Sequence, residues 1–242
     1  MLKRVLLLLL LAITPLPALA AQDYCMDAGH LGPNHYMNPS EVDLINVLGP
    51  PPALGSPGGQ ADLQAVIEAQ EVRTPAEIAK AKSDSCLSIF RFAGVMGPGF
   101  KAANLPFTIV FFQRVFDDGM HGIAAAKKAF NRPRPFVVSL QLKPLVAQPP
   151  NPSYPSGTAT FAIMTAILLA DMVPEKAQAI FERAFAISYS RVIVGIHYPS
   201  DLVAGRIAAA VIDNVLLHDA AFQSDLAKSR AEVRKAVGLS KA

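Results

Sequence analysis

The 242-residue chain has no tryptophan, only two cysteines and no stretch of alternating polar and apolar residues that would indicate a strand. Its apolar runs are rich in alanine, leucine and isoleucine, which favours helices. No apolar run reaches the length of about 20 residues that a membrane-spanning helix needs. No Cys/His spacing suggests a zinc site. The sequence therefore predicts an all-α fold, and its length suits a single domain.

A strong excess of charge is also absent. The formal net charge is +3, and Lys3 and Arg4 contribute two of the three positive charges. An apolar run at residues 5–13 and the sequence Ala-Leu-Ala at 18–20 follow them, as in a cleaved secretory signal peptide. An uncleaved N-terminal anchor is the alternative. Removal of residues 1–20 would leave a chain close to neutral, so we expect a periplasmic or secreted protein with no nucleic-acid partner and no stable membrane insertion.

The two cysteines are Cys25 and Cys86. In an oxidising compartment we expect them to form an intramolecular disulfide that ties the N-terminal arm to a helix. In the chain-entropy model such a bond contributes about 4 kcal/mol. Two free thiols, with Cys86 buried, are the alternative.

Proline and glycine divide the rest of the chain. Residues 21–60 are predicted to form an irregular arm with one short helix near 41–48, and residues 61–242 a helical domain. Residues 131–155 contain seven prolines and are predicted to form an extended loop over the opening of a site. Helices are predicted at residues 60–72, 74–93, 105–117, 119–130, 156–172, 174–194, 199–217 and 220–237.

The candidate catalytic and anion-binding residues are concentrated at residues 188–206. Arg191 continues a buried stripe at helical spacing, and a guanidinium there needs an anion because it cannot lose its charge. Gly195 suits the end of one helix and Pro199 the first turn of the next. His197 would lie at that junction, with Asp201 close enough to hold one ring nitrogen and leave the other free. The alternative is a structural histidine and a solvated carboxylate.

Two further motifs precede this stretch. Lys127 is followed by six residues and then by Arg134-Pro135, and Ser156-Gly157 opens an apolar helical run. With Ser190-Arg191-x5-His197-x3-Asp201, they resemble the three-part signature of the type 2 phosphatidic acid phosphatase superfamily. The soluble bacterial class A non-specific acid phosphatases are the most similar members, and vanadium haloperoxidases are related. The resemblance extends from about residue 72 to 206. It has one departure, because Thr158 replaces the histidine of the family's Pro-Ser-Gly-His motif.

The resemblance implies a single-domain helical bundle of the acid phosphatase and haloperoxidase type, and a metal-independent phosphatase without a cofactor. His197 would be the nucleophile that forms a phosphohistidine, and Asp201 would fix its tautomer. The substrate would be a small-molecule phosphate ester. A homo-oligomer is also implied, and a lipid phosphate stays open as a substrate. The phosphate would be bound by Lys127, Arg134, Ser156, Gly157, Thr158 and Arg191.

Thr158 leaves three interpretations open, since threonine is too weak an acid to protonate a leaving alcohol. The substrate has a good leaving group, such as an aryl phosphate or an anhydride. Alternatively, another residue such as His121 or a loop group supplies the proton. In the third interpretation the protein is a phosphate-binding pseudoenzyme with little catalysis. A vanadium-dependent haloperoxidase is less favoured, because those enzymes also use the missing histidine.

Overall fold

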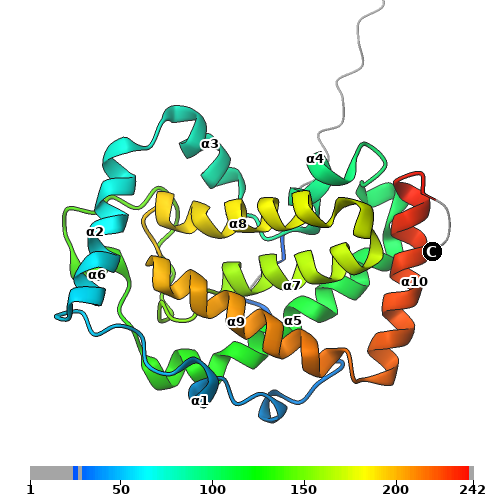
Figure 1. Ribbon diagram of the computed structural model, residues 1–242, viewed down its shortest axis with the longest axis horizontal. Coiled ribbons are helices and arrows are strands. Elements are labelled where there is room, and N and C mark those ends of the chain that lie inside the picture. Colours follow the sequence, from blue (N-terminus) through cyan, green and yellow to red (C-terminus); the bar gives the residue numbers. More distant parts are fainter. Residues whose placement is uncertain (1–23, 27–28, 240–242) are drawn as a thin grey trace, which may run out of the picture.

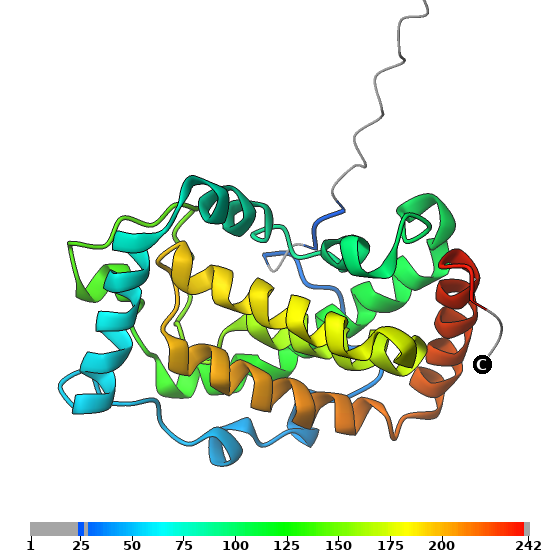
Figure 2. The same cartoon turned by 45° about the horizontal axis from the view of Figure 1, so that its top comes forward.

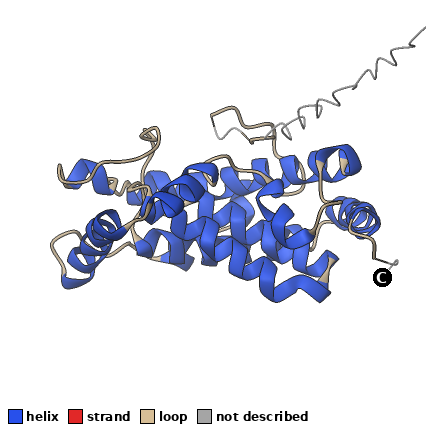
Figure 3. Ribbon diagram, turned by 90° about the horizontal axis from the view of Figure 1, so that it is seen from above, coloured by secondary structure: helices blue, strands red, loops and turns tan. Residues whose placement is uncertain are grey.

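The computed structural model describes residues 24–26 and 29–239. All the regular elements in this part of the chain are helices (Figure 3), with one isolated bridge between Met26 and Leu87. The prediction of an all-α fold is therefore confirmed. The expected signal peptide, residues 1–20, lies outside the described residues. Among the helices that are described, none combines the length and the apolar character needed to cross a bilayer.

The centre of the bundle is helix α7, Gly157–Met172 (Figure 1). Nearly every side chain between Ala159 and Leu169 is buried. A helix that is apolar on all sides must be covered on all sides. The covering helices are α5 (Pro106–Phe130), α8 (Ala177–Ile193), α9 (Pro199–Leu216) and α10 (Ala220–Ala236).

Two helices close the ends of this bundle. Helix α10 packs across one end against α5 and α7, and α2 packs at the other end against α8 and α9 (Figures 1 and 2). The remaining α-helices are α1 (Leu44–Leu48), α2 (Pro57–Val72), α3 (Pro75–Ser83), α4 (Ala93–Met96) and α6 (Pro135–Val138). Single 3-10 turns occupy Pro39–Glu41, Ile89–Phe92, Ala102–Asn104 and Pro174–Lys176.

The predicted helix at residues 74–93 is wrong in its second half, because α3 ends at Ser83. Asp84 is buried and pairs with Arg183 of α8. Cys86 is bonded to Cys25, with the two Cα atoms 5.0 Å apart, which confirms the predicted disulfide. The backbone of Leu87 then accepts a hydrogen bond from the Met26 N–H at 2.8 Å. These fixed partners hold residues 84–88 out of the helical conformation.

The break predicted between residues 117 and 119 is also wrong, because α5 is one continuous helix. Gly119 serves close packing instead of ending the helix. A Cβ atom at this position would lie 2.8 Å from the Sδ of Met164, so glycine lets α7 approach α5. Asp118 is buried in the same helix and accepts hydrogen bonds from the backbone N–H groups of His35 and Tyr36 at 2.8 and 2.9 Å. The N-terminal arm is thereby tied to α5.

Four helix ends meet at one end of the bundle, on the left in Figure 1. They are the C-terminal ends of α5 and α8 and the N-terminal ends of α7 and α9. Gly195 follows α8 with φ of 81°, a conformation that favours glycine, and Pro199 is the first residue of α9. Both residues therefore have the roles predicted for them, and His197 lies at the junction between the two helices.

The approach of α9 to the start of α7 yields a stability prediction. A Cβ atom at Gly205 would lie 2.8 Å from both the Cβ of Ala159 and the backbone oxygen of Ser156. Gly205→Ala should therefore lower the free energy of unfolding by about 1–3 kcal/mol. Gly94→Ala is the matched control, since a Cβ there meets no atom within 4 Å. Thermal melting of both variants is the measurement, and equal melting temperatures would contradict the packing described here.

Candidate active site

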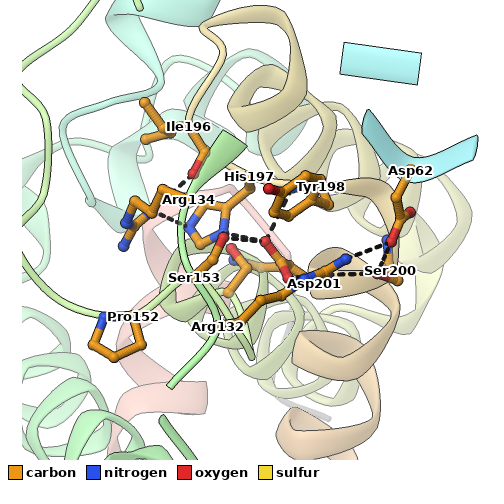
Figure 4. A network of polar contacts seen from close by, with 12 residues as sticks. Asp62, Arg132, Arg134, Pro152, Ser153, Ile196, His197, Tyr198, Ser200 and Asp201 are labelled. Carbon is orange, nitrogen blue, oxygen red and sulfur yellow. Dashed lines mark hydrogen bonds and ion pairs between the residues drawn. The ribbon is translucent and has the colours of Figure 1, made fainter. Parts of the chain in front are cut away.

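The imidazole of His197 is held by partners on both nitrogens (Figure 4). Its Nδ1 lies 2.9 Å from Oδ2 of Asp201, and its Nε2 lies 3.1 Å from Nη1 of Arg134. A carboxylate only accepts and a guanidinium only donates hydrogen bonds. The proton is therefore on Nδ1, and Nε2 carries a lone pair that faces Arg134.

Burial keeps this ring neutral. His197 is only 3% exposed, and this burial lowers the pKa of the imidazole well below its usual value. The hydrogen bond to Asp201 opposes the shift, while the charges of Arg134 and Lys127 add to it. A neutral imidazole can act as a nucleophile even in acidic solution once Nη1 of Arg134 is drawn away from its unprotonated nitrogen.

The carboxylate of Asp201 is fully buried and fully bonded. Burial alone would raise its pKa, but the hydrogen bond from His197 and the charge of Arg132 lower the pKa overall. Oδ2 accepts from His197, from the hydroxyl of Ser153 and from the backbone N–H of Tyr198 at 3.0 Å. Oδ1 accepts from Nη1 of Arg132 at 2.7 Å. This set of donors keeps Asp201 charged and fixes the tautomer of His197.

Arg132 connects this pair to helix α2, a link that the sequence did not reveal. Its Nη2 lies 2.8 Å from Oδ2 of Asp62, and its guanidinium lies 3.9 Å from the centre of the Tyr198 ring. Ser200 contacts both members of this ion pair. Its hydroxyl accepts a hydrogen bond from Arg132 at 2.7 Å, and its backbone N–H donates one to Asp62 at 3.1 Å. Asp62 and Arg132 are therefore positioning residues for Asp201.

Two predicted phosphate-binding cations, Lys127 and Arg134, lie next to this pair and bond to neutral oxygens. Nζ of Lys127 donates to the backbone oxygen of Pro152 at 2.8 Å. Arg134 donates to the backbone and side-chain oxygens of Asn151 at 2.9 and 2.6 Å, and to the backbone oxygen of Ile196 at 2.9 Å. The segment 151–152 of the proline-rich loop therefore covers both cations without neutralising them.

The charge of Arg134 also affects the protonation of Lys127. Burial, together with the charge of Arg134, lowers the pKa of Lys127 to about 7. Burial lowers the pKa of Arg134 to about 10. An anion bound between the two side chains would relieve this repulsion and replace weak acceptors by strong ones.

The start of α7 supplies backbone donors near the same place. The backbone N–H of Ser156 donates a hydrogen bond to the backbone oxygen of Asp201 at 3.0 Å, which joins α7 to α9. The Oγ of Ser156 accepts from the N–H of Ala159 at 3.3 Å as the helix cap. The next N–H groups, those of Gly157 and Thr158, belong to the first helical turn and favour an anion. Thr158 is partly buried, and its hydroxyl makes no hydrogen bond within the described residues.

Arg191 is the predicted site residue whose hydrogen-bond acceptors lie outside the group around His197. Its guanidinium donates to the backbone oxygen of Ala81 at 2.7 Å, to Oγ of Ser85 at 3.1 Å and to Oγ of Ser190. Burial lowers its pKa to about 10. The backbone oxygen of Arg191 accepts from the N–H of Ile196 at 3.1 Å, which stabilises the turn before His197. Its phosphate-binding role stays a prediction.

No group of three or more His, Cys, Asp or Glu side chains in the described part of the chain is placed to hold a metal ion. The pair of covered cations is the arrangement that suits a ligand, and the ligand chemistry it suits is a tetrahedral oxyanion. Arg134 can present a planar fork to two oxygens, and Lys127 a point charge to a third.

The lowered pKa of Lys127 predicts how anion binding depends on pH. Lys127 loses its proton as the pH rises through about 7, so the affinity for sulfate should fall by about tenfold per pH unit above that value. Sulfate is the suitable probe, because its own charge is constant over this range. Lys127→Arg should keep the affinity up to pH 9, and calorimetry is the measurement.

Lys128→Arg, at the exposed neighbouring position, is the matched control and should behave like the wild-type protein. If sulfate affinity of the wild-type protein is constant from pH 6 to 9, Lys127 does not bind the anion.

Comparison with known proteins finds relatives of this chain. Residues 105–224 match the family model of the PAP2 superfamily. An acid phosphatase from Zymomonas mobilis is 31% identical over 204 residues, which cover 80% of this chain and 76% of that protein. A non-specific acid phosphatase from Salmonella typhimurium is 31% identical over 195 residues, which cover 77% of this chain and 78% of that protein.

Two solved structures are similar in fold. A bacterial vanadium-dependent iodoperoxidase matches with a TM-score of 0.56 at 19% identity, over 71% of this chain and 52% of the iodoperoxidase, about half its length. A transmembrane PAP2-type phosphatidylglycerolphosphate phosphatase from Bacillus subtilis matches with a TM-score of 0.52 at 20% identity, over 73% of this chain and 93% of that one. At these identities the similarity concerns the fold alone. The sequence relatives and the family model identify this chain as a member of the PAP2 superfamily.

Proposed function

We propose that the protein hydrolyses phosphoric monoesters or phosphoanhydrides through a phosphohistidine on His197. The observation that supports this most directly is the neutral imidazole of His197, with Nδ1 bonded to Asp201 and the Nε2 lone pair directed at Arg134. The acid phosphatases among the relatives support the same reaction class. The reaction needs no group beyond the side chains described and water.

The reaction proceeds in two displacements. The phosphoryl group binds to Lys127 and Arg134, displacing the oxygens of Asn151 and Pro152 that cover them. Nη1 of Arg134 turns from Nε2 of His197 to a phosphoryl oxygen, which frees the lone pair of Nε2. Nε2 of His197 then forms a bond to phosphorus while the bond to the leaving oxygen breaks, and the leaving group departs with the electron pair. The phosphorylated imidazole is positively charged, and Asp201 stabilises it through Nδ1. In the second step water attacks phosphorus, the N–P bond breaks, and phosphate leaves.

Positive charge is the main contribution of the protein to both steps. Phosphoryl transfer depends on positioning and on stabilising the charge on the non-bridging oxygens. Lys127, Arg134 and the N–H groups of Gly157 and Thr158 serve this role in the proposal. Arg191 would complete the set by turning away from its present acceptors. No metal ion is needed for this scheme.

The cellular location in the proposal is periplasmic or secreted. The disulfide between Cys25 and Cys86 supports this, because such bonds persist in oxidising compartments. The sequence at residues 1–20, which resembles a signal peptide, would direct export to that compartment. The alternative function is a phosphate-binding protein with little turnover, and two features favour it. Thr158 offers no strong acid, and the Nε2 lone pair of His197 accepts a hydrogen bond from Arg134.

Replacement of the nucleophile separates these two functions. With 4-nitrophenyl phosphate, the wild-type protein should turn over and, after acid-free denaturing quench, carry a phosphoryl group on His197 detectable by mass spectrometry. His197→Ala should lose turnover by at least about 10³-fold and still bind sulfate through Lys127 and Arg134. His218→Ala, at an exposed position, is the control. Full activity in His197→Ala would disprove the nucleophile, and absence of turnover in the wild-type protein would favour the binding function.

Thr158 generates a separate prediction about the leaving group. Without a strong acid, wild-type rates should fall steeply as the leaving group becomes more basic, so aryl phosphates react and alkyl phosphates hardly do. Thr158→His should raise alkyl phosphate turnover by about 10²-fold and aryl turnover much less, because an acid helps only a basic leaving oxygen.

A series of phosphates with leaving groups of increasing basicity is the measurement, and sulfate binding by Thr158→His checks that the larger side chain leaves the anion site open. If the wild-type protein cleaves alkyl and aryl phosphates at equal rates, another group donates the proton.

A further inference from the structure

A pocket of about 520 Å³ lies beside Lys127, between helix α5 and the N-terminal arm. Its volume is in the range of pockets that bind small organic molecules and exceeds the space needed for a phosphoryl group. Four apolar residues form one wall, and the remaining lining residues are polar or lie on the loop. The lining residues are Leu31, Met120, Ile123, Ala124, Lys127, Lys128, Asn131, Asn151 and Pro152.

This pocket is continuous with both elements of the anion site. Lys127 and its acceptor Pro152 both line it, with 2.8 Å between Nζ and the backbone oxygen. On the other side, Met120 and Ile123 reach the start of α7. A Cβ atom at Gly157 would lie 3.2 Å from the Sδ of Met120 and 3.4 Å from the Cδ1 of Ile123. A phosphoryl group held by Lys127 and the first turn of α7 therefore has this pocket next to it.

The arm is fixed where it contributes to the wall. Leu31 precedes Gly32, whose backbone oxygen lies 2.9 Å from Nε2 of His121 on α5. Gly32 also allows the arm to approach α5 closely, since a Cβ atom there would lie 2.6 Å from Oδ2 of Asp117. His121 is therefore occupied in holding the arm and the Leu31 side of the pocket in place.

Building on the proposed phosphatase function, we propose that this pocket binds the leaving group of the substrate, and that this group is an apolar ring system. Leu31, Met120, Ile123 and Ala124 offer no hydrogen-bond partners, so a polyhydroxylated leaving group such as a sugar would lose its contacts with water on entering. An aromatic group gives up few hydrogen bonds to water, and burial of its apolar surface in the pocket favours binding. The asparagines lie among the polar lining residues and suit the phosphate end of the ligand.

The missing acid at Thr158 independently favours the same substrate class. A phenolate or naphtholate can leave without accepting a proton in the transition state. A sugar alkoxide is too basic to leave unless it is protonated. The pocket and Thr158 therefore both favour aryl phosphates. The pocket favours their binding, and Thr158 favours them because their leaving group needs no acid.

The test compares three substrates with the wild-type protein. 2-Naphthyl phosphate and phenyl phosphate have leaving groups of similar acidity but different apolar area, and acetyl phosphate is small. The wild-type protein should prefer 2-naphthyl over phenyl phosphate by about tenfold in kcat/KM. The preference should be expressed mainly in KM.

Ala124→Phe should fill the pocket without disturbing the core, because Ala124 is exposed at the pocket. We expect this variant to lose about tenfold or more in kcat/KM for 2-naphthyl phosphate and to keep its activity on acetyl phosphate. Ala125→Phe, also exposed but outside the pocket lining, is the matched control and should change neither activity. Leu31→Ala provides a second variant that removes part of the wall, and it should lower the preference for the naphthyl group.

The possible results distinguish the pocket from the function. If the three phosphates are hydrolysed without preference and Ala124→Phe behaves like Ala125→Phe, the pocket does not bind the leaving group while the proposed function stands. If none is hydrolysed, the proposed function fails, and the pocket is judged by naphthyl fluorescence in equilibrium binding of 2-naphthyl phosphate. Binding that is lost in Ala124→Phe and kept in Ala125→Phe would then support the pocket, and unchanged binding would overturn it.

Discussion

The buried carboxylate of Asp201 is the interaction on which this end of the molecule depends. A buried charge is tolerated only when its oxygens are fully bonded. Here the donors come from different parts of the chain: Arg132 after α5, Ser153 in the proline-rich loop, and His197 and Tyr198 at the start of α9. The backbone oxygen of Asp201 also accepts the N–H of the α7 cap. Three helices and one loop must therefore be in place before this carboxylate is satisfied, and the same contacts orient His197.

The partners of the buried cations separate structural from functional roles. Arg132 pairs with Asp62 and Asp201, and Arg183 pairs with Asp84. Arg134 is buried and Lys127 partly buried, yet within the described chain they bond to oxygens and a ring nitrogen that carry no charge. A cation without an ion-pair partner has electrostatic interaction energy available for an anion, and the nearby carboxylate of Asp201 is already paired with Arg132. Arg191 shares this property, with Ala81, Ser85 and Ser190 as acceptors, although it bonds to a different element.

The sequence predicted the parts of the fold and site that local pattern determines, and missed those set by contacts between distant segments. Helical periodicity identified the long helices, and Gly195 and Pro199 marked the turn that carries His197, because their backbone preferences are intrinsic. The pairing of His197 with Asp201 follows from a spacing of four residues. Asp62 lies 70 residues from Arg132, and nothing in either local sequence indicates the ion pair. Gly119 was misread as a break for the same reason, since its partner Met164 belongs to another helix.

The loop segment 151–152 and the apolar pocket together suggest how binding energy is used. An incoming phosphate must displace the oxygens of Asn151 and Pro152 from the cations, exchanging hydrogen bonds to neutral oxygens for ion pairs with phosphate oxygens. Apolar contacts in the pocket are made away from phosphorus, so they can contribute to opening this segment without stabilising the ground state of the reacting bond. A ligand without an apolar group, such as inorganic phosphate, lacks that contribution. The product phosphate would then bind more weakly than the ester, which allows the covering segment to close again as the site empties.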